Sequence, residues 1–158
     1  MAKIKWLTWS FEGTGNGVKA YTVETAVGAG QSNQKRSDVE LVQFFLYQFF
    51  LDPIHRSLTP KTAAGTTNFK IDGIAGNQTI QGIRIFQDRM KKFGQGSIVD
   101  GIVNIPLGES QHRNTMWSLN AWCYSWGKDK ERFGEIENLP EVIAYAPHLR
   151  TDLLSMQD

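Results

Sequence analysis

Few residues in this sequence could bind a metal ion, and none has the spacing that a metal site needs. The three histidines, His55, His112 and His148, lie far apart, and no His-x-x-x-His or Cys-x-x-Cys pair occurs. Zinc sites take three or four nitrogen or sulfur ligands, usually supplied in closely spaced pairs. The sequence therefore predicts no metal site and no cofactor.

Cys123 is the residue that could act as a thiol nucleophile, with His112 or His148 as its base. It lies between Trp122 and Tyr124 in an aromatic segment, whereas reactive thiols lie at helix N-termini or beside cations. We therefore interpret Cys123 as a buried core residue. As the single cysteine, it also excludes an internal disulfide.

Glycoside hydrolysis would need a pair of carboxylates on either side of the scissile bond. Glu12, Glu109 and Asp100 are candidates by residue type, but surface carboxylates are common. Asp72 precedes a glycine, as Asp100 does, and this dipeptide is typical of a tight turn. We therefore predict that the protein is not an enzyme, and a small hydrolase with an unrecognised site is the alternative.

The composition indicates one globular domain, or a small domain with additions. The chain of 158 residues has 17 Lys and Arg against 16 Asp and Glu, a formal charge of +1, which argues against nucleic acid or anionic membranes as partners. Its 9 Phe, 5 Trp and 4 Tyr favour a core of large side chains, or a surface that stacks on sugars or docks a partner. No apolar stretch approaches the roughly 18 residues of a membrane span. No signal-peptide pattern is present, so we expect synthesis in the cytoplasm without a cleavable signal.

The N-terminal residues favour a β-hairpin. Residues 3–11 nearly alternate apolar and polar side chains, and residues 18–23 return to residue types that favour strands. Residues 12–17 supply three glycines, which tolerate the positive φ angles of a turn. An isolated hairpin is marginal in water, so we expect it to pack on the rest of the chain.

A first helix is predicted from Ser37 to about Phe50. Ser37 and Glu40 have the spacing of a capping box, in which each side chain accepts a backbone N–H at the helix start. Apolar residues recur every four positions and predict an amphipathic helix: Leu41, Phe45 and Phe49. The loop that follows, residues 53–70, is long, and long ordered loops are typical of binding elements.

Two further helices are predicted, one from about Asn77 to Gly94 and one over residues 115–126. The apolar residues of the second helix share one face: Ile80, Ile83, Phe86 and Met90. The third helix is apolar on two faces, of which one comprises Met116, Leu119, Cys123 and Trp126. Such a helix is deeply buried, or shared between the core and a ligand. Pro140 is typical of the start of a short helix in the C-terminal tail.

A set of positions in the middle of the chain has the order and spacing of a known module. In and after the first helix they are Asp38, Val39, Leu41, Val42, Gln43, Leu46, Ile71, Asp72, Gly73, Ile74, Gly76, Thr79, Ile80, Ile83, Phe86 and Gln87. Flanking positions are Ala26, Val27, Gly28 and Gly30 before them, and Asp100, Gly101, Val103, Pro106, Gly108, Thr115, Leu119 and Asn120 after them. This pattern resembles the peptidoglycan-binding domain family over roughly residues 26–122. The resemblance implies a compact three-helix module of the kind usually attached to cell-wall enzymes.

Elementary chemistry gives many of these positions a structural role. Gln43 and Gln87 lie amid apolar helix positions, so their amides need backbone partners, which we expect in the turns. Gly76 is expected to permit close approach at the start of the second helix, and the Thr79 hydroxyl to satisfy an N–H of its first turn. The residues assigned to this structural motif are Ser37, Glu40, Gln43, Asp72, Gly73, Gly76, Phe86, Gln87, Asp100 and Gly101.

The resemblance also implies a ligand site. Family members are thought to hold peptidoglycan in a groove between helices, which places the ligand here between the first two helices and the loop of residues 52–70. The ligand candidates chosen by location are Asp72, Asn77, Gln78 and Thr79 near the turn, with Trp117 and Trp122 as residues that stack on sugars.

We therefore predict a mainly α fold with a three-helix, peptidoglycan-binding-like core over residues 26–126. Residues 1–25 would form an N-terminal β-hairpin extension, and residues 127–158 a C-terminal helical extension packed on the domain or on a partner. The expected function is non-catalytic binding of cell-wall peptidoglycan, after delivery to the periplasm or wall by a specialised secretion or phage route. The alternative is a protein-interaction adaptor on the same scaffold, in a phage or secretion-system context, with a cell-wall-active protein as its partner.

The assignment of the helix faces can be tested directly. Leu41→Ala or Phe86→Ala is expected to lower the free energy of unfolding by roughly 2–5 kcal/mol, because each change leaves a cavity in the core. A denaturant melt measures the loss. A change below about 0.5 kcal/mol, the size typical of surface positions, would show that the apolar faces are wrongly assigned.

Overall fold

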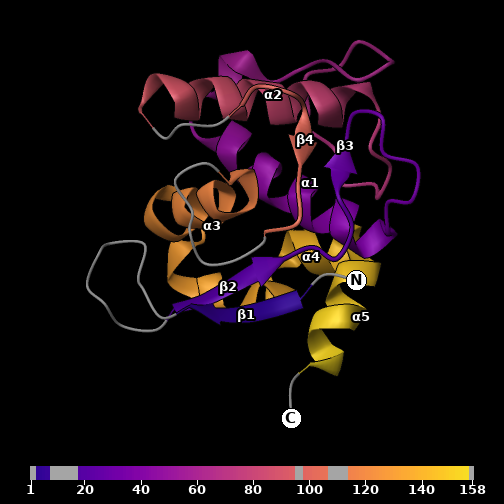
Figure 1. Cartoon of the computed structure of the whole chain (residues 1–158), viewed down its shortest axis with the longest axis vertical. Coiled ribbons are helices and arrows are strands. Elements are labelled where there is room, and N and C mark those ends of the chain that lie inside the picture. The colour runs from indigo at the N-terminus through magenta and orange to yellow at the C-terminus, as the bar shows by residue number, and fades with distance from the viewer. Residues whose placement is uncertain (1–2, 8–17, 95–97, 107–113, 157–158) are drawn as a thin grey trace.

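The computed structural model describes residues 3–7, 18–94, 98–106 and 114–156. These residues form a mainly helical protein with two small two-stranded sheets (Figure 1). The predicted mainly α class is confirmed at this level. In the described part of the chain, no helix is both long enough and apolar enough to span a bilayer.

The helices lie close to the predicted ranges. They are α1 (Arg36–Leu51), α2 (Asn77–Lys92), α3 (Thr115–Trp126), α4 (Pro140–Tyr145) and α5 (Pro147–Ser155), with two 3₁₀ helices, η1 (Arg56–Leu58) and η2 (Lys130–Asn138). The strands are β1 (Lys3–Leu7), β2 (Val18–Thr22), β3 (Val27–Gly28) and β4 (Ile102–Val103). β1 pairs antiparallel with β2, and β3 with β4. The pairing expected for the N-terminal hairpin is thus present, while the glycines at 12–17 lie outside the described residues.

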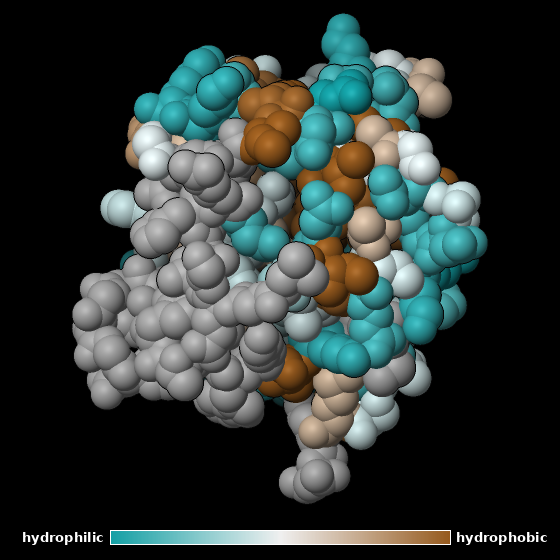
Figure 2. Space-filling model, in the orientation of Figure 1, coloured by the Kyte–Doolittle hydropathy of each residue, from teal (hydrophilic) through white to brown (hydrophobic). Residues whose placement is uncertain are grey.

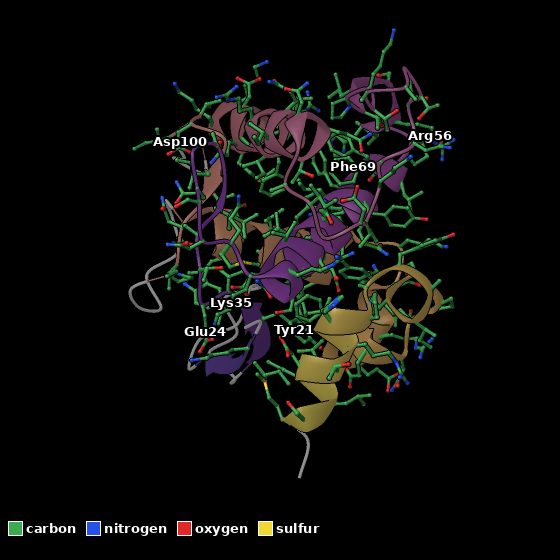
Figure 3. The ribbon with its side chains drawn as sticks, turned by 90° about the vertical axis from the view of Figure 1, so that its right-hand side faces the viewer. Tyr21, Glu24, Lys35, Arg56, Phe69 and Asp100 are labelled. Carbon is green, nitrogen blue, oxygen red and sulfur yellow. The ribbon has the colours of Figure 1, made fainter. Side chains whose placement is uncertain are left out.

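α1 is the central helix of the fold. Thirteen of its sixteen residues are buried, including Leu41, Phe45 and Phe49. The amphipathic pattern predicted for this helix is therefore wrong, because α2 and α5 pack on opposite sides of it (Figures 1 and 3). A helix covered on both sides has no solvent face to keep polar, so its polar side chains must find partners inside the protein.

Gln43 of α1 connects a turn to the start of α2. Its Oε1 accepts hydrogen bonds from the backbone N–H groups of Asp72 (3.0 Å) and Gly73 (2.8 Å). Its Nε2 donates to Asp72 Oδ1 (2.9 Å), Ile74 O (2.9 Å) and Thr79 Oγ1 (3.0 Å). Gly73 has a φ of 76°, which glycine adopts without strain. We call this set of bonds the first amide network.

Gln87 of α2 makes the same set of bonds one connection later in the chain. Its Oε1 accepts from the backbone N–H groups of Asp100 (3.1 Å) and Gly101 (2.9 Å). Its Nε2 donates to Asp100 Oδ1 (3.0 Å), Ile102 O (3.0 Å) and Thr115 Oγ1 (3.1 Å). Gly101 has a φ of 74°. This second amide network joins α2 to the start of α3, and the expectation that both glutamines bond to turns is confirmed.

The capping box predicted at Ser37 and Glu40 is wrong. α1 begins at Arg36, and its N-cap residue, Lys35, makes no side-chain capping bond. The Glu40 carboxylate instead accepts the backbone N–H groups of His148 and of the next residue, both at 3.0 Å, at the start of α5. A buried carboxylate needs several donors, and the first turn of α5 supplies them.

Two other structural roles also differ from those expected. Gly76 is the extended N-cap of α2, and a Cβ at this position would meet nothing within 4 Å. Close approach therefore does not require glycine here. The Thr79 hydroxyl accepts from Gln43 at 3.0 Å and donates to Ile74 O at 3.5 Å, so its partners are a side chain of α1 and the turn before α2.

The hairpin and the tail both contribute to the same buried core as the central helices. Asn120 of α3 exchanges two 2.8 Å hydrogen bonds with the backbone of Tyr21 in β2. The Tyr21 hydroxyl donates to Phe133 O in η2 at 2.7 Å. Leu149 and Leu153 of α5 are fully buried. These contacts place β2, η2 and α5 on the central helices.

α3 has the predicted bounds and most of the predicted burial. Met116, Leu119 and Cys123 are buried, but Trp126 is 72% exposed. The difference arises because Trp126 is the last residue of the helix and Gly127 turns the chain away.

The first amide network can be tested by removing its amide. Gln43→Ala is expected to lower the free energy of unfolding by roughly 2–4 kcal/mol, because the backbone N–H groups of the 72–73 turn would lose their acceptor inside the protein. Gln87→Ala should behave alike. Gln81→Ala, at a half-buried position of α2, is the control and should change stability by no more than about 0.5 kcal/mol. Equal losses for all three variants in a denaturant melt would contradict the role of the networks.

Candidate functional site

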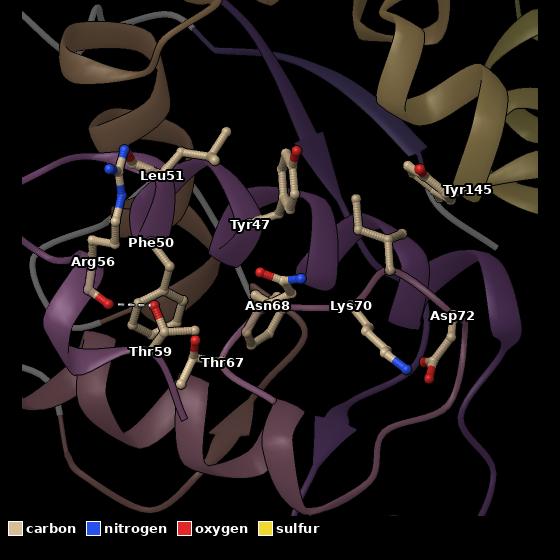
Figure 4. Close-up of a pocket in the computed structure, with 12 residues that line it drawn as sticks. Tyr47, Phe50, Leu51, Arg56, Thr59, Thr67, Asn68, Lys70, Asp72 and Tyr145 are labelled. Carbon is tan, nitrogen blue, oxygen red and sulfur yellow. Dashed lines mark hydrogen bonds between the residues drawn. The ribbon is translucent and has the colours of Figure 1, made fainter. Parts of the chain in front are cut away.

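A pocket of about 540 Å³ lies between α1, the segment that precedes α2, and α4 (Figure 4). We call it the loop pocket. Its lining residues come from α1 (Tyr47, Phe50 and Leu51), from the connecting segment (Arg56, Thr59 and residues 67–72) and from α4 (Tyr145). It overlaps the region where the resemblance places a ligand, although α2 contributes no lining residue.

Packing of aromatic rings forms the floor of the loop pocket. Phe69 is buried, with its ring centroid 5.3 Å from that of Phe50. A Cβ on Gly82 of α2 would lie 2.8 Å from the Phe69 ring. The absence of a side chain at position 82 therefore lets Phe69 pack between α1 and α2, which returns the loop to the core.

Gln78 of α2 holds the wall of the loop pocket. Its Nε2 donates to the carbonyl oxygens of Pro60 (2.8 Å) and Asn68 (2.9 Å), and its Oε1 accepts from the backbone N–H of Lys70 (3.1 Å). Gln78 was a ligand candidate from sequence, but these bonds occupy both ends of its amide. It therefore positions the residues that line the pocket.

The loop pocket carries more positive than negative charge. Arg56 lies at one end of it and Lys70 and Asp72 toward the other (Figure 4). Neither cation forms an ion pair with the described residues, although Arg56 donates to Leu51 O at 3.2 Å. Asp72 Oδ1 is already bonded to the Gln43 amide and to the backbone N–H of the turn. The two cations are thus available to an anionic ligand.

Two tyrosines line the pocket, Tyr47 from α1 and Tyr145 from α4. Tyr145 is exposed and Tyr47 half-buried. Burial, and then the carboxylate of Glu141, raise the pKa of Tyr47, so its hydroxyl stays protonated at neutral pH and can donate. Both rings also offer apolar faces to a sugar or to an apolar side chain.

Of the six ligand candidates taken from the sequence, Asp72 alone lines the loop pocket. Asn77 is exposed at the first residue of α2, and Thr79 is buried in the first amide network. Trp117 is 1% exposed, so the expectation that its ring stacks on a sugar is wrong. Trp122 is almost fully buried, edge-to-face against Phe49 at 5.2 Å.

The sequence interpretation missed four residues that line the pocket. Tyr47 belongs to α1, Arg56 and Lys70 to the connecting segment and Tyr145 to α4, and no motif links them. Trp126 carried one usable signal, its position directly before the glycine that ends the helix, because a helix end has fewer neighbours to pack against than the helix middle.

The side chains considered for catalysis either have structural roles or lie outside the residues that the structure describes. Cys123 is buried, its Sγ donates to Phe45 O at 3.8 Å, and burial raises the pKa of the thiol. Asp100 belongs to the second amide network. Glu12, Glu109 and His112 lie outside the described residues. Within the described ranges, no three His, Cys, Asp or Glu side chains gather as metal ligands would.

Beside the pocket, two carboxylates share one donor. Gln48 Nε2 donates to Asp129 Oδ2 (2.9 Å) and to Glu141 Oε1 (3.0 Å). Burial, and next the adjacent Asp129, raise the pKa of Glu141. A carboxyl whose pKa is raised by folding stabilises the protein when protonated, and this contribution is lost as the pH rises through the folded-state pKa.

We expect Glu141→Gln to raise the free energy of unfolding at pH 7, by less than about 1 kcal/mol because solvent screens this partly exposed site. The gain should shrink as the pH falls toward 4, where Glu141 becomes protonated. Glu135→Gln removes the same charge from an exposed pair with Arg132 at 3.0 Å and should give no gain. Denaturant melts at both pH values measure the effect, and a Glu141→Gln protein that is less stable than wild type at pH 7 would refute the explanation.

This chain matches no protein-family model, no curated protein and no solved structure. The candidate site is therefore assigned from its own geometry and charge. The loop pocket has two cations without ion pairs among the described residues and two tyrosines. It is therefore suited to an acidic ligand that also offers polar and apolar groups to the tyrosines.

Proposed function

We propose that this protein is a non-catalytic module that binds bacterial peptidoglycan, with a stem peptide lying in the loop pocket. The observation that carries the proposal is the pair of amide networks. Gln43 and Gln87 hold Asp-Gly turns, and these are the residues on which the resemblance to the peptidoglycan-binding domain family depends. On this proposal, α1, α2 and α3 are the three helices of the module, and the hairpin and the C-terminal segment are additions to it.

The charge of the loop pocket supports the choice of ligand. Stem peptides of peptidoglycan carry free carboxylates, and Arg and Lys form their strongest hydrogen bonds with such groups. Arg56 and Lys70 lie at separated points of the pocket, so two carboxylates of one stem could be bound together. Tyr47 and Tyr145 would contact the apolar parts of the stem or an adjoining sugar ring.

Exposed apolar side chains favour a second candidate function, a protein-interaction adaptor. Ile54, Phe93 and Trp126 are all more than half exposed and border one pocket. Figure 2 shows that hydrophobic side chains also interrupt the hydrophilic surface on the face it presents. Such patches are typical of docking surfaces. The partner would be a cell-wall-active protein in a phage or secretion system.

Purified sacculi test the wall-binding proposal. The wild-type protein is expected to sediment with sacculi at low salt, and an Arg56→Gln, Lys70→Gln double variant to be retained at least about tenfold less, the effect of losing roughly 1.4 kcal/mol of binding. Titration with soluble muropeptides should show the same difference.

The control is a Lys61→Gln, Lys91→Gln double variant, which removes two exposed positive charges that do not line the loop pocket. It should bind nearly as well as wild type. Absence of retention at low salt would exclude wall binding. An equal loss of retention in both double variants would show that binding is an unspecific attraction between positive charges and the wall.

A further inference from the structure

A second pocket, of about 510 Å³, lies on another part of the surface, where the turn after α1 meets the C-terminal end of α2 and α3. We call it the Trp126 pocket. It is lined by His55 of the turn, by Arg89 of α2, by Phe93 after α2, and by Trp122 and Trp126 of α3, among others. None of its lining residues is shared with the loop pocket.

Arg89 has no polar side-chain partner among the described residues of this pocket. Its guanidinium lies 5.4 Å from the centroid of the Phe93 ring. The buried Nε of Arg89 has no hydrogen-bond partner among the described residues, and no ion pair of the guanidinium is found among them. A buried donor without an acceptor destabilises the protein. Arg89 as a whole is half-buried and lines the pocket, so its guanidinium is suited to receive an anion that enters there.

His55 provides a second buried polar atom, Nδ1, for which the described residues offer no hydrogen-bond partner of good geometry. The residue is 6% exposed, its ring stacks on Phe49 at 3.9 Å, and its buried Nδ1 has no hydrogen-bond partner in the described part of the chain. Burial lowers the pKa of His55, Asp52 acts in the opposite direction, Arg89 lowers it further, and the nearby backbone of Phe49 raises it. The ring is therefore neutral at pH 7, and the tautomer with its proton on Nδ1 can donate a hydrogen bond.

The rim of the Trp126 pocket is apolar and open. Phe93 is 62% exposed and Trp126 72% exposed, and Ile54 stands beside them. Asp52 supplies the one carboxylate of the lining, and its Oδ1 accepts from the backbone N–H of Ile54 within its own turn. The pocket therefore combines a large apolar surface with a cation that has no ion pair in the described part of the chain. A neutral sugar would leave that cation unpaired.

We propose that the Trp126 pocket binds the C-terminal carboxylate of a peptide that ends in an aromatic or large aliphatic residue. The carboxylate would contact Arg89 and His55, and the terminal side chain would lie between Phe93 and Trp126. The planar guanidinium suits a carboxylate because it donates two parallel hydrogen bonds. This site does not depend on wall binding, and it gives the adaptor function a partner of defined chemistry.

Calorimetric titration of the full chain tests the proposal with two peptides, acetyl-Gly-Gly-Phe as the free acid and as the amide. The free acid is expected to bind at least about tenfold more tightly, a difference of roughly 1.4 kcal/mol, because only it carries the carboxylate. This comparison uses the wild-type protein and so does not depend on any variant folding. Equal binding of the two peptides, or binding of neither, would overturn the proposal.

Matched variants locate the contact. Arg89→Gln should abolish the preference for the free acid, whereas Lys91→Gln, which removes the same charge from an exposed position in the last turn of α2, should retain it. Trp126→Ala should weaken both peptides. Loss of the preference in the Lys91→Gln protein, or its persistence in Arg89→Gln, would refute the assignment.

Two further ligands distinguish this peptide site from the loop pocket and from a sugar site. A stem pentapeptide ending in D-Ala lacks a large terminal side chain and should bind the Trp126 pocket weakly even where it binds the loop pocket. A chitin disaccharide should not bind there. Disaccharide binding that is lost in Trp126→Ala and kept in Arg89→Gln would replace the proposal with a sugar site.

Discussion

The polar side chains buried along α1 hold the rest of the structure in place. Asp38 accepts the backbone N–H groups of residues 24 and 25 after the hairpin, while Glu40 caps α5. Gln43 holds the turn before α2, and Gln48 bonds to two carboxylates of the C-terminal segment. Each of these groups would be costly to bury without a partner. The buried position of α1 is therefore stable only when all four segments pack on it. The N-terminal and C-terminal additions are therefore attached to the same helix as the central turns.

Local signals predicted the elements well, and long-range contacts explain what they missed. The bounds of α2 and α3 follow from spacing and from residues that end helices, which act within a few positions. The bonds of Gln43 and Gln87 to the turns could be predicted, because an amide among apolar neighbours must find hydrogen-bond partners. Ser37 and Glu40 had the spacing of a capping box, but Glu40 bonds across 108 residues to α5. The local spacing of Ser37 and Glu40 does not reveal that a distant helix start competes for the Glu40 carboxylate.

The candidate site was less predictable than the fold, because its members come from three separate segments. The loop pocket combines Tyr47 of α1, Arg56 of the connecting segment and Tyr145 of α4, and only tertiary packing brings these elements together. The sequence favoured Trp117 as a stacking residue over Trp126 at the end of the same helix, but Trp117 is buried in the core and Trp126 is exposed. Residue type indicated that an aromatic surface could exist, while only tertiary packing decides which rings reach solvent.

The two amide networks have a consequence for how this fold can diversify. Gln43 lies 29 positions before Asp72, whereas Gln87 lies only 13 before Asp100, yet the bonds formed are the same. The geometry that positions each following helix is thus independent of how much chain is inserted between glutamine and turn. Closing a longer connection costs little additional entropy. The first connection can accordingly gain, lose or exchange residues, and with them its ligand preference, while the helices keep their arrangement.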